Sequence, residues 1–427
     1  MKRRTLLKSG GIALFAAGGV LPPFIMRSVQ AAEGPAAFER QKVLVTIFQR
    51  FGMDGLMAAT PYDDERLAKL RPSLMLGRPG SGDPMARIDL DGRFGLHPAF
   101  APLLPMFRDG DLAIVHAAGS PHNTRSHTEA QIWWESGTPG NHRTTDGWLN
   151  RALGAAEVRD GLPLRAIATT SERPRIFYGE HAAATLADAD SLALSVADTG
   201  TADSLVGTLR ALYSQASNEL VRASGLSGLE TARILSEARS ARESGGSYPE
   251  GSAFAQSLSE IAWLIKANVG LQVAFAESRT AGENNRGTWD THSNQAAPDG
   301  PFPLMADDFS RSLVAFFEDL GSLRDDVVVL TLTDFGRNVV ENEGIGTDHG
   351  RATAMFVMGG AVRGGRVYGE LPERFERDAL EDLMDLPVTT DFRAVISSLT
   401  ARQLGVRDDR TVFPGWNGGR MEDIAAV

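Results

Sequence analysis

Val-Val-Val-Leu-Thr-Leu-Thr-Asp-Phe-Gly-Arg, residues 327–337, is the stretch that decides the fold. A short run of β-branched and apolar residues predicts a buried strand, and the polar residues after it predict a loop at the strand's end. The same form recurs at residues 42–49 (KVLVTIFQ), before the turn at residues 52–55 (GMDG), and at residues 112–116 (LAIVH). Three strands are therefore expected to end in polar loops.

Helical patterns lie between these strands. Residues 308–320 repeat apolar side chains every three or four positions, and Thr390 and Gly405 bracket a second such pattern. Alternating strands and helices predict an α/β domain over residues 32–427, with a mostly parallel sheet covered by helices and ligands bound at the carboxyl ends of strands. Residues 199–280 are mainly helical in pattern, and we expect them to form an insertion in this domain.

The amino terminus has the pattern of an export signal. Arg3-Arg4 precede two leucines and Lys8, the arrangement that the twin-arginine translocon recognises. Glycine and proline interrupt the apolar stretch at residues 10–26, whereas a membrane span needs about 20 mainly apolar residues. Residues 1–31 are thus predicted to be a cleaved twin-arginine signal peptide rather than a permanent anchor. The mature protein is expected in the periplasm or otherwise outside the cytoplasm, with no stable membrane insertion.

Composition excludes several classes of function. The formal net charge is -11, and removal of residues 1–31 takes away five basic residues and no acidic one, which gives -16. So acidic a protein is unsuited to binding nucleic acid, which depends on Lys and Arg neutralising phosphates. The chain has no cysteine, which excludes thiol catalysis, zinc-thiolate sites and iron-sulfur clusters. No haem or dinucleotide motif supports a redox enzyme.

Histidine and aspartate gather in a few polar clusters. Four of the eight histidines fall in such clusters: His122, His127, His292 and His349. Asp290 lies two residues before His292, and Asp348 directly precedes His349. Divalent cations take Asp oxygen and His nitrogen as ligands, so these pairs fit a metal site. Asp54 and Asp334 add carboxylates at two strand ends.

Each feature also has a structural explanation. Asp54 between glycines shapes a turn, and short Asp-His pairs are common in surface loops. Ser126 and Glu129 match a capping box, which predicts that Ser126 starts a helix. That cap does not exclude a nucleophile at Ser126, because a helix amino terminus also stabilises an attacking oxygen and a bound anion.

Several separate motifs resemble one family. They are FQRFGMDGL, HPAFAPLLPMFRDGDLAIVHAAG, RSHTEAQIWWESG, WDTHSNQ, TLTDFGR and GTDHGRATAMFVMGGAVRGGRVYG, in order between residues 42 and 405. The chain thereby resembles the exported family catalogued as domain of unknown function 1501, which is grouped with the alkaline phosphatase and sulfatase superfamily. The resemblance implies a doubly wound α/β core with helices on both faces of the sheet and metals at the strand ends.

The resemblance also implies roles for single residues. Asp54 is similar to the superfamily's early metal-binding Asp, and Ser126 to its nucleophile, with Thr124 as second choice. The later metal ligands correspond to Asp290, His292, Asp334 and His349, with Asp348 beside the last. The pattern departs from the superfamily in three places. The middle pair is Asp-x-His instead of Asp-x-x-x-His, Phe335 stands where many members have a metal-binding His, and Arg-Ser-His is not the phosphatase nucleophile motif.

Two functional hypotheses are compatible with these features. The first is a hydrolase of small anionic phosphate or sulfate esters that depends on a divalent metal (Zn, Ca or Mg). Arg125 or Arg337 would hold the anion by paired N–H donors, although Arg337 is equally suited to be the structural partner of a strand-end carboxylate. The second is a non-catalytic periplasmic protein that keeps the fold and one metal for binding or stability. Phe335 and the short Asp-x-His spacing favour the second.

Overall fold

The computed structural model describes most of the chain beyond residue 39. The described residues are 40–156, 164–186, 199–218, 245–279 and 287–425, with a few positions between 221 and 233. The predicted signal peptide, residues 1–31, lies outside the described residues.

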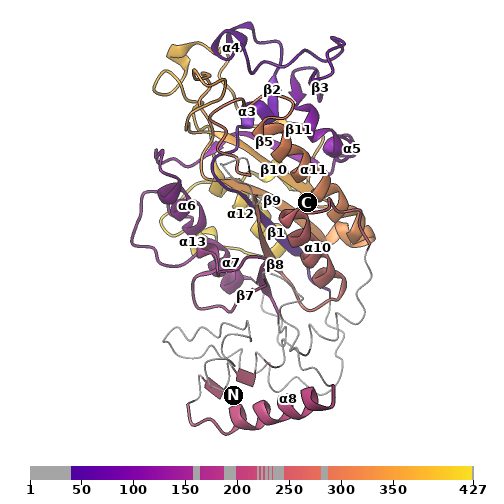
Figure 1. Cartoon of the computed structure of the whole chain (residues 1–427). Coiled ribbons are helices and arrows are strands. Elements are labelled where there is room, and N and C mark those ends of the chain that lie inside the picture. Colours follow the sequence, from indigo (N-terminus) through magenta and orange to yellow (C-terminus); the bar gives the residue numbers. More distant parts are fainter. Residues whose placement is uncertain are drawn as a thin grey trace.

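A nine-stranded sheet forms the centre of the described chain (Figure 1). Its long strands are β1 (Val43–Gln49), β5 (Leu112–Gly119), β8 (Val273–Ser278), β9 (Val327–Thr333) and β10 (Thr353–Gly359). The short strands β6 (Ala166–Ala168), β7 (Ala184–Thr185), β11 (Arg366–Tyr368) and β12 (Thr390–Asp391) extend it, in the order β11-β5-β10-β9-β1-β8-β6-β7, with β12 also paired to β5. Only β10 runs antiparallel to its neighbours in the described sheet, so the predicted, mostly parallel sheet is confirmed.

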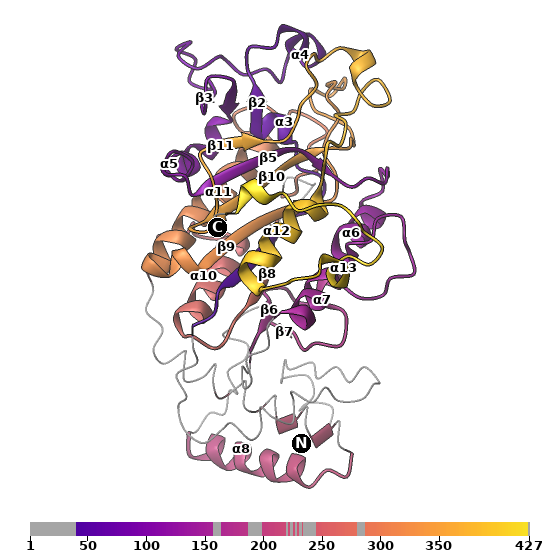
Figure 2. The same ribbon diagram turned by 180° about the vertical axis from the view of Figure 1, so that it is seen from behind.

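Helices cover both faces of this sheet (Figures 1 and 2). On one face lie α10 (Ala253–Lys266) and α11 (Pro301–Leu320), and on the other α7 (Trp148–Ala155) and α12 (Phe392–Leu404). The β1 side chains alternate between the two apolar cores, with Val45 and Ile47 in one and Leu44 and Phe48 in the other. The predicted doubly covered α/β architecture is therefore confirmed. Within the described ranges, no helix has the length and apolar character needed to cross a bilayer.

The segment predicted as a helical insertion divides into two parts. Its first helix, α8 (Thr199–Ser214), lies away from the sheet (Figures 1 and 2). The carboxyl part of the segment belongs to the core instead, because β8 pairs with β1 and β6 while Phe254, Leu258 and Ile261 of α10 are buried. Residues 219–244 lie almost entirely outside the described residues. Within the predicted insertion, α10 and β8 are thus part of the core, and β8 is a strand that the helical pattern did not indicate.

Predicted helix boundaries correspond to capping contacts. Ser126 caps α6 (His127–Ser136), and Gly405 ends α12 in the left-handed conformation with φ of 70°. Asp391, and not its neighbour Thr390, caps α12 by accepting the N–H of Arg393.

A second, smaller sheet of three strands lies apart from the large sheet in the strand order. It consists of β2 (Ala59–Pro61), β4 (Phe94–Leu96) and β3 (Ile88–Asp89), and the short helices α3 (Gly55–Ala58), α4 (Glu65–Leu70) and α5 (Leu104–Asp109) accompany it. At the carboxyl end of β9 in the large sheet, Asp334 contacts the first residue of α6, His127.

Candidate metal centre

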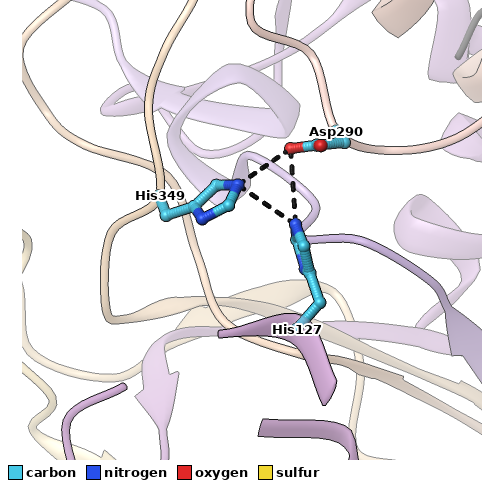
Figure 3. Close-up of side chains that lie close together, drawn as sticks. All are labelled: His127, Asp290 and His349. Carbon is cyan, nitrogen blue, oxygen red and sulfur yellow. Dashed lines mark hydrogen bonds and ion pairs between the residues drawn. The ribbon is translucent and has the colours of Figure 1, made fainter. Parts of the chain in front are cut away.

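Three side chains from distant parts of the sequence meet one another (Figure 3). They lie near the carboxyl end of β9, because one of them, His127, contacts Asp334 directly after that strand. His127 is the first residue of α6, Asp290 lies in the loop after β8, and His349 lies in the loop before β10. The Nε2 atoms of His127 and His349 are 3.0 Å apart. Both face Oδ1 of Asp290, at 3.6 Å from His127 and 3.2 Å from His349. Within the described residues, these three are the only side chains grouped closely enough to hold one metal ion.

His292 enlarges this cluster. Its Nε2 lies 2.9 Å from Oδ1 of Asp290 and 3.2 Å from Nε2 of His349. Its side chain is 41% exposed, against 19% for His127 and 23% for His349, so it lies on the solvent side. We use "imidazole cluster" for His127, His292 and His349 together with Asp290.

A hydrogen-bond acceptor lies beside the other ring nitrogen of each histidine. The Nδ1 atoms lie 2.7 Å from Oδ2 of Asp334 for His127, 2.9 Å from Oδ1 of Asp348 for His292, and 2.9 Å from the carbonyl oxygen of Arg125 for His349. With a proton on each Nδ1, every Nε2 has its lone pair available. Metal-binding histidines almost always have such an acceptor at the second nitrogen.

The separations within the imidazole cluster suit a small divalent ion. Two ligand atoms about 2.1 Å from one ion and at tetrahedral angles are about 3.4 Å apart. The contacts between His349 and its neighbours, 3.0 to 3.2 Å, and that between His127 and Asp290, 3.6 Å, are close to this value. The two nitrogen donors and one oxygen donor of His127, His349 and Asp290, with the His292 nitrogen beside Asp290 and His349, fit Zn²⁺ better than Ca²⁺ or Mg²⁺, which prefer all-oxygen sites.

The cluster is electrostatically polarised. Burial by itself lowers the pKa of His127, but hydrogen bonds and charges from Asp290 and Asp334 outweigh it and raise that pKa to about 9. Burial by itself raises the pKa of Asp290, but hydrogen bonds from His127 and His349 and the Arg337 charge hold it well below its usual range. The Asp290 carboxylate is therefore held ionised, and the His127 imidazole beside it holds its proton more strongly than a free imidazole does. A bound metal ion would take the place of that proton.

Aromatic rings enclose the inner side of the cluster. Phe335 stacks on His127 with ring centroids 4.7 Å apart, and its ring lies 4.9 Å from that of His349. Phe51 meets His127 edge to face at 5.3 Å, while its backbone N–H donates to Asp334. Phe335, the sequence's departure from a metal-binding His, therefore packs against two of the imidazoles and limits their rotation.

Asp334 contacts the cluster through His127. Its side chain is fully buried, and Oδ2 accepts hydrogen bonds from His127 and, at 2.9 Å, from Gln131 one turn along α6. Asp348 has the corresponding position beside His292, where burial raises its pKa but hydrogen bonds from Asn342 and His292 lower it overall. Asp334 and Asp348, both predicted as ligands, thus contact the Nδ1 atoms of His127 and His292, on the side of each ring away from Nε2.

Asp54 and Arg337 lie beneath the surface. The Asp54 carboxylate is 1% exposed and accepts from the N–H of Met57, from Arg71 and from Gln295. None of its hydrogen-bond partners is a member of the imidazole cluster. Arg337 is also buried and donates to Oδ1 of Asp290 at 2.6 Å. Of its two predicted roles, this position corresponds to the structural partner of a strand-end carboxylate.

The predicted nucleophiles lie at the start of α6. The exposed Ser126 accepts the N–H of Glu129 at 3.5 Å, and the Thr124 hydroxyl donates to the Glu129 carboxylate at 2.6 Å. Arg125 donates to Asp385 at 2.6 Å and to Asp382 at 3.2 Å, with 41% of its side chain exposed. The structure thus sets Arg125 beside the His349 loop, since its carbonyl faces Nδ1 of His349 and its Nε donates to the His349 carbonyl.

Sequence reasoning did not select His127 as a ligand. The capping box accounted for Ser126 and Glu129 and left the residue after the cap without a role. The sequence did contain a signal for the contact with Asp334. His127 and Gln131 are four residues apart, so they share one helix face and can reach the same acceptor. A histidine in the first turn, near the positive end of the helix dipole, is also an unfavourable place for an imidazolium and calls for a compensating anion.

Comparisons with known proteins identify a family. The family described as "Protein of unknown function (DUF1501)" matches residues 114–414, and the chain belongs to it. No curated protein matches the chain. One similar solved structure is described as "Crystal structure of Ps i-CgsB in complex with k-i-k-neocarrahexaose". The likeness covers 89% of this chain and 75% of that chain, with 10% sequence identity and a TM-score of 0.38, and says nothing about a substrate of this chain.

Proposed function

We propose that this member of the DUF1501 family is a metal-dependent hydrolase of phosphate or sulfate esters that acts outside the cytoplasm. One observation carries the metal part of the proposal. Three Nε2 atoms face Oδ1 of Asp290 or one another, while each Nδ1 lies at hydrogen-bond distance from an acceptor. Unless they bind a cation, such closely spaced imidazoles require a shared proton, so the arrangement favours an ion of the Zn²⁺ type.

The hydrolytic part rests on what surrounds the cluster. A bound divalent ion would polarise an ester oxygen and lower the pKa of an attacking hydroxyl. Ser126 supplies a hydroxyl next to the ligand His127, and Thr124 supplies a second one. Arg125 lies between them in sequence, and its half-exposed guanidinium, which donates to Asp382, Asp385 and the His349 carbonyl, could pair with a phosphate or sulfate oxygen in exchange for one of these partners. The chain thus offers two hydroxyls and an arginine in the three residues that precede the ligand His127.

Metal content and hydrolysis should be measured together. Protein purified from the periplasm would be analysed for bound metals and assayed with aryl phosphate and aryl sulfate esters. We expect about one zinc per chain and hydrolysis that His349→Ala abolishes. Loss of activity in Ser126→Ala with retained zinc would identify Ser126 as the nucleophile, and activity that survives there but is lost in Thr124→Val would identify Thr124.

Two outcomes would contradict the proposal. A protein with no bound zinc and no zinc affinity would remove its basis. Zinc bound tightly without hydrolysis of either ester would favour the second hypothesis, a non-catalytic periplasmic protein that keeps one metal. The observation in favour of that alternative is that the Ser126 side chain already serves as the cap of α6.

Export is part of the proposal and has its own test. It rests on Arg3-Arg4 and the short apolar stretch after them, which lie outside the described residues. Replacement of both arginines by Lys should leave the precursor in the cytoplasm, because the twin-arginine translocon recognises the pair. Normal export of the double variant would show that another route is used.

A further inference from the structure

A chain of buried hydrogen bonds connects Asp54 to the imidazole cluster. It begins where the Gln295 side chain donates to Oδ2 of Asp54 at 2.7 Å, and it continues where the Thr347 hydroxyl donates to Oε1 of Gln295, also at 2.7 Å. Nε of Arg337 then donates to the Thr347 hydroxyl at 3.3 Å. All four residues are at most 2% exposed, so water does not compete for these bonds.

The last bond of this chain reaches a candidate ligand. Arg337 donates through one terminal nitrogen to Oδ1 of Asp290 and through the other to the Thr347 carbonyl. The guanidinium is planar and its donors have a fixed geometry, so the atoms that hold Arg337 also fix where the Asp290 carboxylate lies. Thr347 is separated from His349 by one residue, and Gln295 follows His292 by three. The chain therefore joins the loops that carry the cluster.

The chain has one possible direction. A carboxylate only accepts, so Asp54 turns the Gln295 amide with its NH₂ toward Asp54 and its oxygen toward Thr347. That oxygen needs a donor, and the Thr347 hydroxyl must give it its proton. Its lone pairs are then left for Arg337, which has donors only. Each group thus has a single role, set from the Asp54 end.

Asp54 is itself held firmly. Its other contacts are the N–H of Met57, which it caps at 3.0 Å, and Arg71 at 3.2 Å. Arg71 is fully buried and also donates to the carbonyl oxygens of Val339 and Asn338. The charge of Asp54 is therefore balanced without the imidazole cluster, and its position is anchored to the chain segment that comes after Arg337.

We propose that Asp54 is a positioning residue, which fixes the ligand Asp290 through three buried side chains: Gln295, Thr347 and Arg337. The inference rests on the proposed function, since it concerns a ligand of the proposed metal centre. It gives Asp54, which the family resemblance implied to be a ligand, a task that its buried place permits. Groups that orient metal ligands typically contribute about 10- to 100-fold to metal affinity.

Thr347→Val is the sharpest test. It keeps the shape of the side chain and removes only the hydroxyl that links Gln295 to Arg337. Zinc affinity would be measured by competition with a chelator, and the absorption spectrum of the Co²⁺ form would report ligand geometry. We expect affinity about 10- to 100-fold weaker, an altered Co²⁺ spectrum, and recovery of both in Thr347→Ser.

The matched control is Thr291→Val. Thr291 lies between Asp290 and His292 and is fully buried, but its hydroxyl has no hydrogen-bond partner in the described residues. The same chemical change should therefore leave zinc affinity within about threefold of the wild type. Equal losses in Thr291→Val and Thr347→Val would overturn the proposal, because general loosening of the loops would then explain both.

Asp54 is tested by a double-mutant cycle. Asp54→Asn places an amide where donors already point, so the chain loses its fixed direction. If Asp54 acts through Thr347, the double variant Asp54→Asn/Thr347→Val should bind zinc no more weakly than the weaker single variant. Additive losses would overturn the proposal, as would wild-type affinity in both single variants. Gln295→Met, which breaks the same chain, would replace Asp54→Asn if that variant did not fold.

The outcomes separate this proposal from the proposed function. Wild-type protein that binds no zinc would contradict both. Wild-type protein that binds zinc, with variants of unchanged affinity, would contradict only the positioning role of Asp54. Zinc affinity lowered in Thr347→Val and restored in Thr347→Ser would support the role even if no ester were hydrolysed.

Discussion

Two buried aspartate-arginine pairs near the carboxyl ends of the strands differ in what else reaches the carboxylate. In the pair of Asp54 and Arg71, both side chains are 1% exposed. In the pair of Asp290 and Arg337, the arginine side chain is fully buried, but that of the aspartate is 15% exposed and lies beside three imidazoles. The pair of Asp54 and Arg71 is thus enclosed, whereas Asp290 of the other pair is partly exposed.

This difference explains their different suitability as ligands. Every hydrogen-bond partner of Asp54 in the described chain is a donor fixed by the fold, so a cation would have to displace a buried guanidinium or amide. Oδ1 of Asp290 accepts from Arg337 and is also the atom that the imidazole nitrogens of His127, His292 and His349 approach. The enclosed Asp54 is therefore suited to anchor the fold, whereas Asp290, which imidazoles approach, is suited to be a metal ligand.

The largest expected effect is the loss of the open carboxylate. Asp290→Ala should weaken zinc binding by on the order of a thousandfold, about 4 kcal/mol, since it removes the atom that all three imidazoles approach and exceeds the usual effect of a ligand's hydrogen-bond partner. Isothermal titration of metal-free protein with zinc would measure it. Tight zinc binding in Asp290→Ala would show that the imidazoles alone form the site.

Opening the enclosed pair should affect stability first. Arg71→Met leaves the Asp54 carboxylate buried without its counter-charge, which costs about 3 kcal/mol or more. Urea unfolding would show a lower midpoint. The double variant Arg71→Met/Asp54→Leu should regain part of this loss, because it removes the unpaired charge. A single variant as stable as the wild type would mean that the pair is not the anchor described.

The pH dependence of zinc binding should report the proton on His127. The pKa of His127 is raised to about 9, so metal-free protein carries this proton at neutral pH and zinc must displace it. Apparent affinity should therefore rise about tenfold per pH unit as the pH increases toward 9, about 1.4 kcal/mol per unit. His127→Asn should bind more weakly with a shallower slope, and an unchanged slope would assign the proton elsewhere.

The same shift has a consequence for the metal-free protein. A raised pKa contributes stability that is complete below the ordinary value of 6.5 and is lost as the pH rises through about 9. Thermal unfolding of metal-free protein should thus occur at lower temperature at about pH 9.5 than at about pH 6.5, by a larger amount than in His127→Asn. Zinc should reduce this dependence by replacing the proton.

The smallest expected effect concerns the cap of α6. Ser126→Ala should lower stability by about 1 kcal/mol, whereas Ser126→Asp should keep most of it, because Asp also accepts the N–H of the third helical residue. Thermal unfolding would measure both. A loss of several kcal/mol in either variant would indicate that Ser126 contributes more than the cap.

Local pattern predicted much of this structure. The runs at residues 42–49, 112–116 and 327–332 form β1, β5 and β9, because β-branched and apolar residues between turns favour buried strands. Ser126 and Gly405 mark helix ends because capping depends on neighbours in sequence. In contrast, β8 was not predicted, because its six residues lie in a segment with a mainly helical pattern. Its strand form depends on pairing with β1 and β6 on either side.

What the sequence by itself determined is therefore the set of strands, the helix caps, the family resemblance, and the supply of aspartate and histidine at strand ends. Only the tertiary structure decided their roles. His127 joined the cluster because α6 places it against Asp334, a contact across 207 positions that no local pattern encodes. Asp54 is enclosed because Arg71 and Gln295 donate hydrogen bonds to its carboxylate. Propensity depends on neighbours in sequence, whereas a ligand set depends on which distant side chains share a few ångströms of space.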